Sequence, residues 1–204
     1  KQDDAKRIAQ VEKFSLKLGL SEMSRLLEAS GTPLRLTVDL TSASLDEPDF
    51  ETLLVHLCED TGFPLSDLTI ELDPATVNLK ECARLKNTLD RLKAIGCHMA
   101  LDEFGSLQSG LGQLIESGAN LLKISPALIT DLETSIDKRH LVEAIVTLAG
   151  KFDYQVVALG VERSEQEKIL RQLGCGHVQG ALISRWVSPR EAEIHVREFV
   201  FEEH

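Results

Sequence analysis

Apolar positions along the chain alternate between short continuous runs and longer stretches in which apolar residues recur every three or four positions. The short runs predict strands and the longer stretches predict helices. Strands are expected near 34–40, 67–72, 97–101, 120–124, 155–159 and 177–179. Helices are expected at about 3–14, 21–30, 50–57, 79–92, 108–116, 136–151, 164–174 and from residue 188 onward. This alternation is typical of a parallel sheet whose strands are connected by helices.

Several helix ends carry local sequence signals. Gly96 provides a left-handed stop after the helix that precedes the third strand. Ser164 and Glu167 have the spacing of a capping box, which predicts that a helix starts at Ser164. Ser188 and Pro189 predict the start of the last helix. Trp186, just before it, is expected to anchor that helix by packing against the core.

The strand spacing, roughly 25–30 residues, favours an α/β fold of the (β/α) barrel type over an open doubly wound sheet. Such a barrel needs about eight strands, and no candidate for a first strand precedes Leu34. We therefore expect a modified TIM (β/α) barrel whose first strand is missing from the chain. The expected organisation is one domain over 1–204, with leading helices at 1–32, barrel repeats at 33–187 and a C-terminal helix at 188–204.

The composition of the chain argues against some classes of binding partner. The chain has 204 residues, is 43% hydrophobic and carries a formal net charge of −11. This charge argues against DNA or RNA binding and against direct contact with an anionic membrane. No apolar run is long enough to span a bilayer, so we expect a cytoplasmic location, within a larger or membrane-anchored protein or alone. Buried reduced thiols are expected at the four cysteines, Cys58, Cys82, Cys97 and Cys175.

Acidic residues follow several of the apolar runs: Asp39, Glu71, Asp102, Glu103 and Glu162. The carboxyl ends of parallel strands share one rim, so these carboxylates can converge on a divalent ion. Simpler interpretations stay open for individual residues. Asp39 could cap a helix, and Glu162 could interact with a helix dipole. Lys123, at the end of another run, could neutralise the acids through an ion pair or contact a phosphate.

Six runs, in order and spacing, resemble the EAL family of bacterial cyclic di-GMP phosphodiesterases. They are Leu36-Thr-Val-Asp-Leu-Thr-Ser-Ala, Ile70-Glu-Leu, Ala100-Leu-Asp-Glu-Phe-Gly, Leu122-Lys-Ile, Val156-Val-Ala-Leu-Gly-Val-Glu and Leu173-Gly-Cys-Gly-His-Val-Gln-Gly. The resemblance extends from about residue 10 to the C-terminus. It implies a modified TIM barrel, and active members of the family use two divalent metals to hydrolyse cyclic di-GMP.

The resemblance also assigns roles to particular residues. It implies that Glu71 and Asp102 bind one metal ion and that Glu103, in place of an aspartate, reaches a second. Asp39 replaces an asparagine ligand and keeps a hard oxygen donor. The expected ions are magnesium, manganese or calcium. Nucleotide-binding roles are implied at the remaining matched positions, Lys123, Gln179 and Glu162.

Departures from the family pattern predict a loss of catalysis. No Glu-Ala-Leu triplet precedes Asp39, and the family's water-activating glutamate is Leu159 here, whose alkyl side chain accepts no proton. Two further acids of the family are Pro74 and Ser125, and Leu107 interrupts a glycine-rich loop. We therefore expect no catalytic residue and no phosphodiesterase activity.

Three functions remain open. The first is an inactive domain that binds cyclic di-GMP and controls a neighbouring domain or protein partner, by family analogy in motility, pilus or flagellar function or biofilm formation. The second is a protein-interaction module that no longer binds nucleotide. The third, which Leu159 opposes, is an active phosphodiesterase. An open barrel would expose strand edges, which predicts either a homodimer or coverage by another segment.

Overall fold

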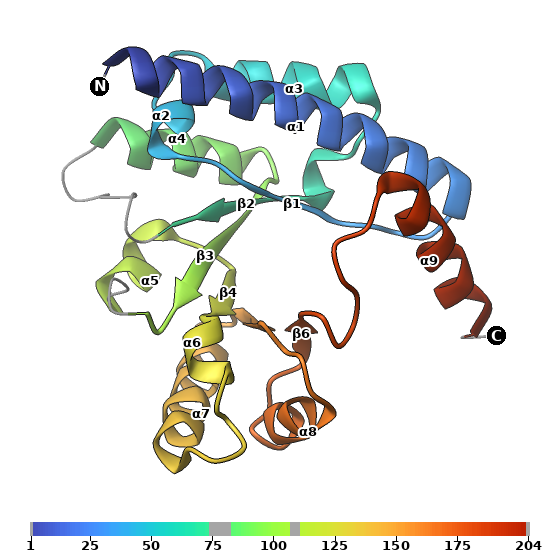
Figure 1. Ribbon diagram of the computed structural model, residues 1–204. Coiled ribbons are helices and arrows are strands. Elements are labelled where there is room, and N and C mark those ends of the chain that lie inside the picture. The colour runs from blue at the N-terminus through green and yellow to red at the C-terminus, as the bar shows by residue number, and fades with distance from the viewer. Residues whose placement is uncertain (1, 74–82, 107–110, 203–204) are drawn as a thin grey trace. The chain divides into compact units, whose positions relative to one another are not determined.

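The computed structural model describes residues 2–73, 83–106 and 111–202 (Figure 1). The described strands are β1 (Leu36–Asp39), β2 (Leu68–Leu72), β3 (His98–Phe104), β4 (Leu121–Ile124), β5 (Gln155–Leu159) and β6 (His177–Gln179). They are hydrogen-bonded in chain order, from β1 to β6. The pairs β3–β4, β4–β5 and β5–β6 are parallel. Each strand that the apolar pattern predicts is therefore present, and the alternating β/α organisation is confirmed.

Helices connect these strands. They are α1 (Gln2–Ser30), α2 (Ser42–Leu45), α3 (Phe50–Thr61), the short 3-10 helix η1 (Leu65–Asp67), α4 (Ala83–Ala94), α5 (Leu111–Ser117), α6 (Pro126–Ile129), α7 (Ile136–Lys151), α8 (Ser164–Gln172) and α9 (Pro189–Glu202). The apolar pattern predicted the long helix over 136–151 with its observed bounds. The pattern missed α2, α6 and η1, because each is too short to show a helical period.

The chain divides into two compact units. The first contains 1–70, 83–98 and 186–204. Within it, α1 contacts α2, α3, α9 and β1, and Figure 1 shows α9 beside the C-terminal half of α1. Fully buried leucines of this unit include Leu16, Leu20, Leu45, Leu54 and Leu85. The expected single domain with its three sections stays a prediction.

α1 is one continuous helix, so the predicted break between residues 14 and 21 is wrong. Ala9, Leu16 and Leu20 are all buried and lie on one face of the helix. Gly19, in the middle of the helix, lies against β1. A Cβ at Gly19 would come within 3.7 Å of the Leu36 side chain. The small residue therefore permits close packing and does not end the helix.

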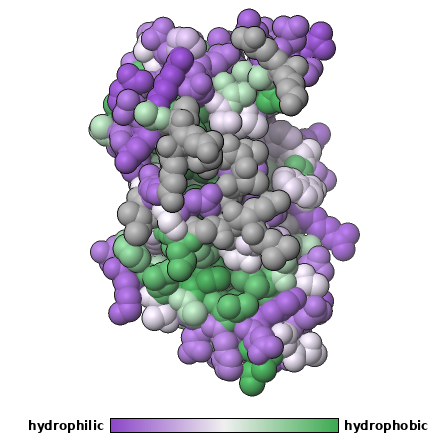
Figure 2. Space-filling view, turned by 90° about the vertical axis from the view of Figure 1, so that its left-hand side faces the viewer, coloured by the Kyte–Doolittle hydropathy of each residue, from purple (hydrophilic) through white to green (hydrophobic). Residues whose placement is uncertain are grey.

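The second unit contains 71–82 and 99–185. In this unit, β4 and β5 form the centre of the sheet, and α6 and α7 both contact β5. Leu122, Ile124 and Ala158 on the two strands are almost fully buried. Figure 2 shows one face of the molecule, on which hydrophobic residues gather in the lower part.

β3 extends further than the sequence predicted. The apolar run indicated an end at Leu101, but the strand continues to Phe104, which is buried and pairs with Ile124. The register shifts between Leu101 and Phe104. The two acids of the family motif therefore lie inside the strand, at a β-bulge.

The start of α8 is stabilised differently from the prediction. The helix begins at Ser164 as expected, but Gln166 and not Glu167 reaches back to the chain before the helix. The Gln166 side-chain oxygen accepts hydrogen bonds from the backbone N–H groups of Glu162 and Arg163, at 2.9 and 3.0 Å. The capping box expected between Ser164 and Glu167 is therefore wrong, and Gln166 satisfies the backbone donors at the start of the helix instead.

Other predictions from composition have mixed outcomes. Cys58, Cys97 and Cys175 are buried free thiols, as predicted, and Cys82 lies outside the described residues. Trp186 is 100% exposed, so its predicted packing against the core is wrong. Within the part of the chain that the structure describes, no helix combines the length and hydrophobicity required to cross a membrane.

Candidate functional site

A buried ion pair lies at the centre of the candidate site. Glu71 on β2 and Lys123 on β4 are 6% and 7% exposed, and the Lys123 ammonium donates a hydrogen bond to the Glu71 carboxylate. Asp102 on β3 is half-buried, with its Oδ1 3.9 Å from the Lys123 Nζ. One oxygen of Glu71 and one of Asp102 lie within 4.8 Å of each other. The second unit thus brings together three charged side chains from neighbouring strands.

The burial of this cluster explains why its charges are paired. All five residues of β2 are buried, so Glu71 leaves water when the strand forms. A buried carboxylate is costly unless a cation and hydrogen bonds compensate it. Lys123 supplies that cation. The ion pair that the sequence analysis left as one interpretation of Lys123 is therefore present.

The bulge in β3 determines how the two acids of the Asp-Glu pair lie. Leu101 pairs with Leu122 and Phe104 with Ile124, so Asp102 and Glu103 stand opposite one residue, Lys123. Glu103 has a positive φ of 44°, an uncommon conformation for a residue with a side chain, and it is exposed. Bulges and such conformations are frequent beside functional sites, where they redirect side chains.

The same face of the sheet continues onto β5 and β6. Lys123 pairs with Val157, and Leu159 pairs with Gln179. Side chains two residues apart on a strand point to the same face, and paired residues of parallel strands do so as well. Leu159 and Gln179 therefore share the face of Lys123. The alkyl side chain of Leu159, half-buried there, offers no oxygen to a metal or a proton.

The end of β6 is tied to the chain that follows β5. The Val161 N–H donates to the Gln179 carbonyl at 3.1 Å, and the Val161 carbonyl accepts from the Leu182 N–H at 3.1 Å. Gly180 is required at this close approach, since a Cβ there would lie 2.2 Å from the Val161 carbonyl oxygen. These contacts hold Gln179 beside the segment that carries Glu162.

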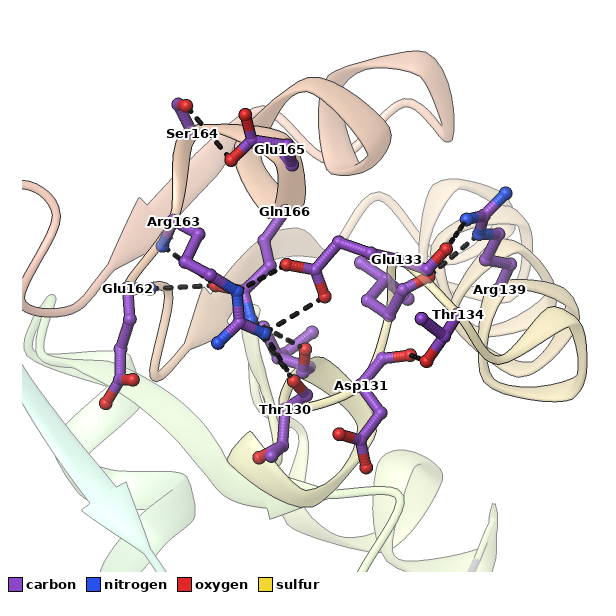
Figure 3. A network of polar contacts seen from close by, with 12 residues as sticks. Thr130, Asp131, Glu133, Thr134, Arg139, Glu162, Arg163, Ser164, Glu165 and Gln166 are labelled. Carbon is purple, nitrogen blue, oxygen red and sulfur yellow. Dashed lines mark hydrogen bonds and ion pairs between the residues drawn. The ribbon is translucent and has the colours of Figure 1, made fainter.

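Glu162 follows β5 and is exposed. Figure 3 shows its carboxylate directed away from the guanidinium of the next residue, Arg163, while its backbone N–H is bound by Gln166. Asp39, the last residue of β1, is exposed and belongs to the first unit. The predicted nucleotide-binding and metal-binding roles of these two residues stay predictions.

A polar network that the sequence analysis did not identify fixes the start of α8 (Figure 3). The Arg163 guanidinium donates to Glu133 at 2.5 and 3.0 Å and to the Thr130 carbonyl at 2.6 Å. The hydrogen bond from Arg163 lowers the pKa of Glu133, and the bond to Glu133 raises the pKa of Arg163. Gln166, almost fully buried, also donates to the Ile129 carbonyl at 3.0 Å. No motif signalled these contacts, because they join residues about 30 positions apart.

Ser125, which replaces a family aspartate by the resemblance, has a local structural role. Its side chain is buried and accepts a hydrogen bond from the Ala127 N–H at 3.4 Å, which caps α6. Pro74 and Leu107, two further departures from the family pattern, lie outside the described residues.

The arrangement can hold one hard cation between Glu71 and Asp102. Calcium–oxygen distances in proteins are about 2.3–2.6 Å, so two oxygens up to 4.8 Å apart can contact the same ion. The Lys123 ammonium, which now contacts Glu71, would have to move or share that carboxylate. Lys123 also supplies a positive charge for a phosphate oxygen.

Comparisons with known proteins identify the family. The EAL domain family matches residues 3–186, and the chain belongs to it. It is 28% identical over 197 residues to the cyclic di-GMP phosphodiesterase NbdA of Pseudomonas aeruginosa, which covers 96% of this chain and 25% of that protein. The chain spans about 19% to 30% of the length of the curated relatives most similar in this comparison, of which NbdA is one.

Two solved structures show the same fold. The EAL domain of Mycobacterium smegmatis DcpA matches with a TM-score of 0.86 at 25% identity, over 93% of this chain and 85% of that chain. Klebsiella pneumoniae BlrP1, in a complex with calcium and cyclic di-GMP, matches with a TM-score of 0.79 at 25% identity, over 87% of this chain and 44% of that chain. The predicted EAL membership and the modified TIM-barrel fold are confirmed.

Proposed function

We propose that this EAL domain is catalytically silent and acts as a cyclic di-GMP receptor that controls a neighbouring domain or a protein partner. The observation that carries the proposal is the composition of one sheet face. Lys123 and Gln179 remain there as polar groups for a nucleotide, whereas Leu159 stands at the position where the family has its water-activating glutamate. The alkyl side chain of Leu159 cannot take a proton from the attacking water, so the family's own base is lost at this position.

The metal site is proposed to be partial. Glu71 and Asp102, both in the second unit, are the carboxylates that we propose as ligands, and Asp39 is proposed as a further ligand on the family resemblance alone. When bound, a divalent ion would neutralise charge on the phosphoryl oxygens. Glu103 keeps a carboxylate beside Asp102, but its exposed position on the bulge supports a weaker role at a second ion.

The metal proposal has a direct test in thermal unfolding. Calcium, magnesium or manganese should raise the melting temperature, because an ion that binds only the folded state stabilises it. Asp102→Ala should abolish this rise. Glu143→Ala, which removes an exposed acid from α7, should leave it intact. An equal response of both variants would show that the ions act through general charge screening.

One observation favours the alternative function, a protein-interaction module without nucleotide. Lys123 is already paired with Glu71 in a buried position, and this pairing competes with both a phosphate and a metal ion. A domain whose lysine neutralises its own acids could keep the fold and lose the ligand.

Isothermal titration of cyclic di-GMP into the purified chain, with and without calcium, separates these functions. The same mixtures are analysed chromatographically for the linear dinucleotide. We expect binding without product. Lys123→Met should weaken this binding at least tenfold, whereas Lys138→Met, which removes a surface lysine paired with Asp131, should not.

Other outcomes would replace the proposal. Linear product that disappears in Asp102→Ala would establish a phosphodiesterase despite Leu159. A folded chain that binds no nucleotide in either condition would support the interaction module.

A further inference from the structure

The outer face of α1 exposes a row of large apolar side chains. Ile8, Val11, Phe14 and Leu18 are 46%, 65%, 70% and 53% exposed. Their spacing of three or four residues places them along one side of the helix. The opposite side, with Ala9, Leu16 and Leu20, is buried in the first unit. α1 thus has an inner apolar face that packs on its unit and an outer apolar face in solvent.

This outer row differs from scattered surface leucines. Single exposed apolar residues are common, but contiguous apolar patches on soluble proteins generally mark contact surfaces. All four residues lie within three turns of one helix. Phe14 is the most exposed of them and stands at the middle of the row.

Charged residues lie at both ends of the row. Asp4 and Arg7 precede the apolar residues, and Glu22 and Arg25 follow them. At each end the acid comes first and the arginine three residues later. Arg25 and Glu22 also contact each other at 2.8 Å, with side chains 55% and 35% exposed, so both remain accessible from outside.

We propose that this face of α1 binds a second copy of the same chain, with the two α1 helices antiparallel across a two-fold axis beside Phe14. Reversing the helix about the point midway between Phe14 and Ser15 sets Val11 against Leu18 of the partner subunit. The same reversal sets Asp4 against Arg25 of the partner subunit, and Arg7 against Glu22 of the partner subunit. Each contact occurs twice, as a two-fold interface requires.

The order of the charges selects this orientation. A parallel two-fold arrangement would place every residue beside its own copy, so Asp4 would meet an acid and Arg7 a base. Like charges at an interface are unfavourable, whereas the antiparallel arrangement pairs opposite charges at both ends. The charge pattern of α1 is complementary to a reversed copy of the same helix. This self-complementarity favours a second copy of the chain over an unrelated partner.

Sedimentation equilibrium of the full chain over a concentration series tests the interface. We expect a monomer–dimer equilibrium that Phe14→Glu weakens at least tenfold. Glutamate is a better helix former than phenylalanine, so the substitution at an exposed position preserves α1. Leu141→Glu, at a position on α7 that is 52% exposed, is the matched control and should leave the dissociation constant unchanged. A monomer at every concentration, or equal effects of both variants, would refute the proposal.

Charge reversal tests the pairing. Arg7→Glu places an acid against Glu22 of the partner subunit and should weaken the dimer, as should Glu22→Arg. The double variant Arg7→Glu with Glu22→Arg restores opposite charges and should recover dimerisation to within a few-fold of the parent. If the double variant is as weak as the two changes combined, the antiparallel register is wrong.

Disulfide trapping tests the orientation. Ser15 lies beside the proposed axis, so Ser15→Cys should form a cross-linked dimer under mild oxidation. Ser21 lies about 10 Å along the helix from the axis, which separates its two copies by roughly 20 Å, so Ser21→Cys should not cross-link. The parent chain under the same oxidant is the control. Equal cross-linking at both positions would indicate a parallel arrangement and contradict the proposal.

Discussion

At the scale of single residues, the Lys123–Glu71 pair is the feature on which both fold and site depend. We predict that Lys123→Met destabilises the chain by about 3–5 kcal/mol, because it removes the cation that lies against a buried carboxylate. Urea unfolding at neutral pH measures the loss.

Lys138→Met provides the comparison for this substitution. Lys138 pairs with Asp131 at 3.3 Å, but the Asp131 side chain is 65% exposed, so the substitution should cost about 1 kcal/mol or less. If the two variants unfold at the same urea concentration, the buried Lys123–Glu71 pair contributes no more to the free energy of unfolding than the exposed pair does.

The buried thiols give a residue-scale prediction for alkaline pH. Burial raises the pKa of Cys58 to about 11 and that of Cys97 to about 12, from 9.0 in the unfolded chain. The folded state therefore keeps protons that the unfolded state releases, and their stabilising contribution, complete below pH 9, is lost as the pH rises toward about 11. The urea midpoint should fall over this range, and it should fall less in the Cys58→Ala and Cys97→Ala variants.

At the scale of elements, the approach of β6 to Val161 holds the segment that contains Glu162. We predict that Gly180→Ala destabilises the chain by about 1–3 kcal/mol, since its Cβ would collide with the Val161 backbone at 2.2 Å. Gly176→Ala, three residues before β6 ends, meets no atom within 4 Å and should change stability by less than about 0.5 kcal/mol. Hydrogen exchange should locate the Gly180→Ala effect at Val161 and Leu182, whose N–H groups bond across this junction.

The elements also show how far the sequence predicts the fold. α7 and β5 were predicted with their observed bounds, because each has a clear apolar period between polar ends. The strand β3 was predicted too short, because adjacent acids interrupt an apolar pattern even where a bulge keeps them in the strand. The continuous α1 was predicted as two helices, although Ala9, Leu16 and Leu20 keep one helical period across residues 14–21.

The sequence predicted which residues belong to the candidate site, but it did not predict the contacts between them. Glu71, Asp102 and Lys123 follow from the strand pattern and from the family resemblance, because strand ends carry such groups. The contact between Lys123 and Glu71 depends on strand order and register, which a single sequence does not contain. The Arg163–Glu133 network was missed for the same reason.

At the scale of the whole molecule, the net charge of −11 on each chain opposes the proposed dimer, whereas the local charge pairs favour it. Two copies repel each other over distances comparable with the Debye length, which is about 20 Å near 20 mM salt and about 8 Å at 150 mM. The proposed contacts of Arg7 and Arg25 with acids of the partner subunit act at short range and are screened less. The long-range repulsion is therefore the part that salt removes first.

We predict that dimerisation strengthens by a few-fold when sodium chloride rises from about 20 to 150 mM, measured by sedimentation equilibrium at constant pH. The double variant Arg7→Glu with Glu22→Arg keeps the net charge and should show the same salt response. Arg7→Glu alone adds two negative charges per chain relative to the parent, so it should need more salt to associate. A dimer that weakens steadily with salt would show that attraction between the helices outweighs the repulsion of the whole molecules.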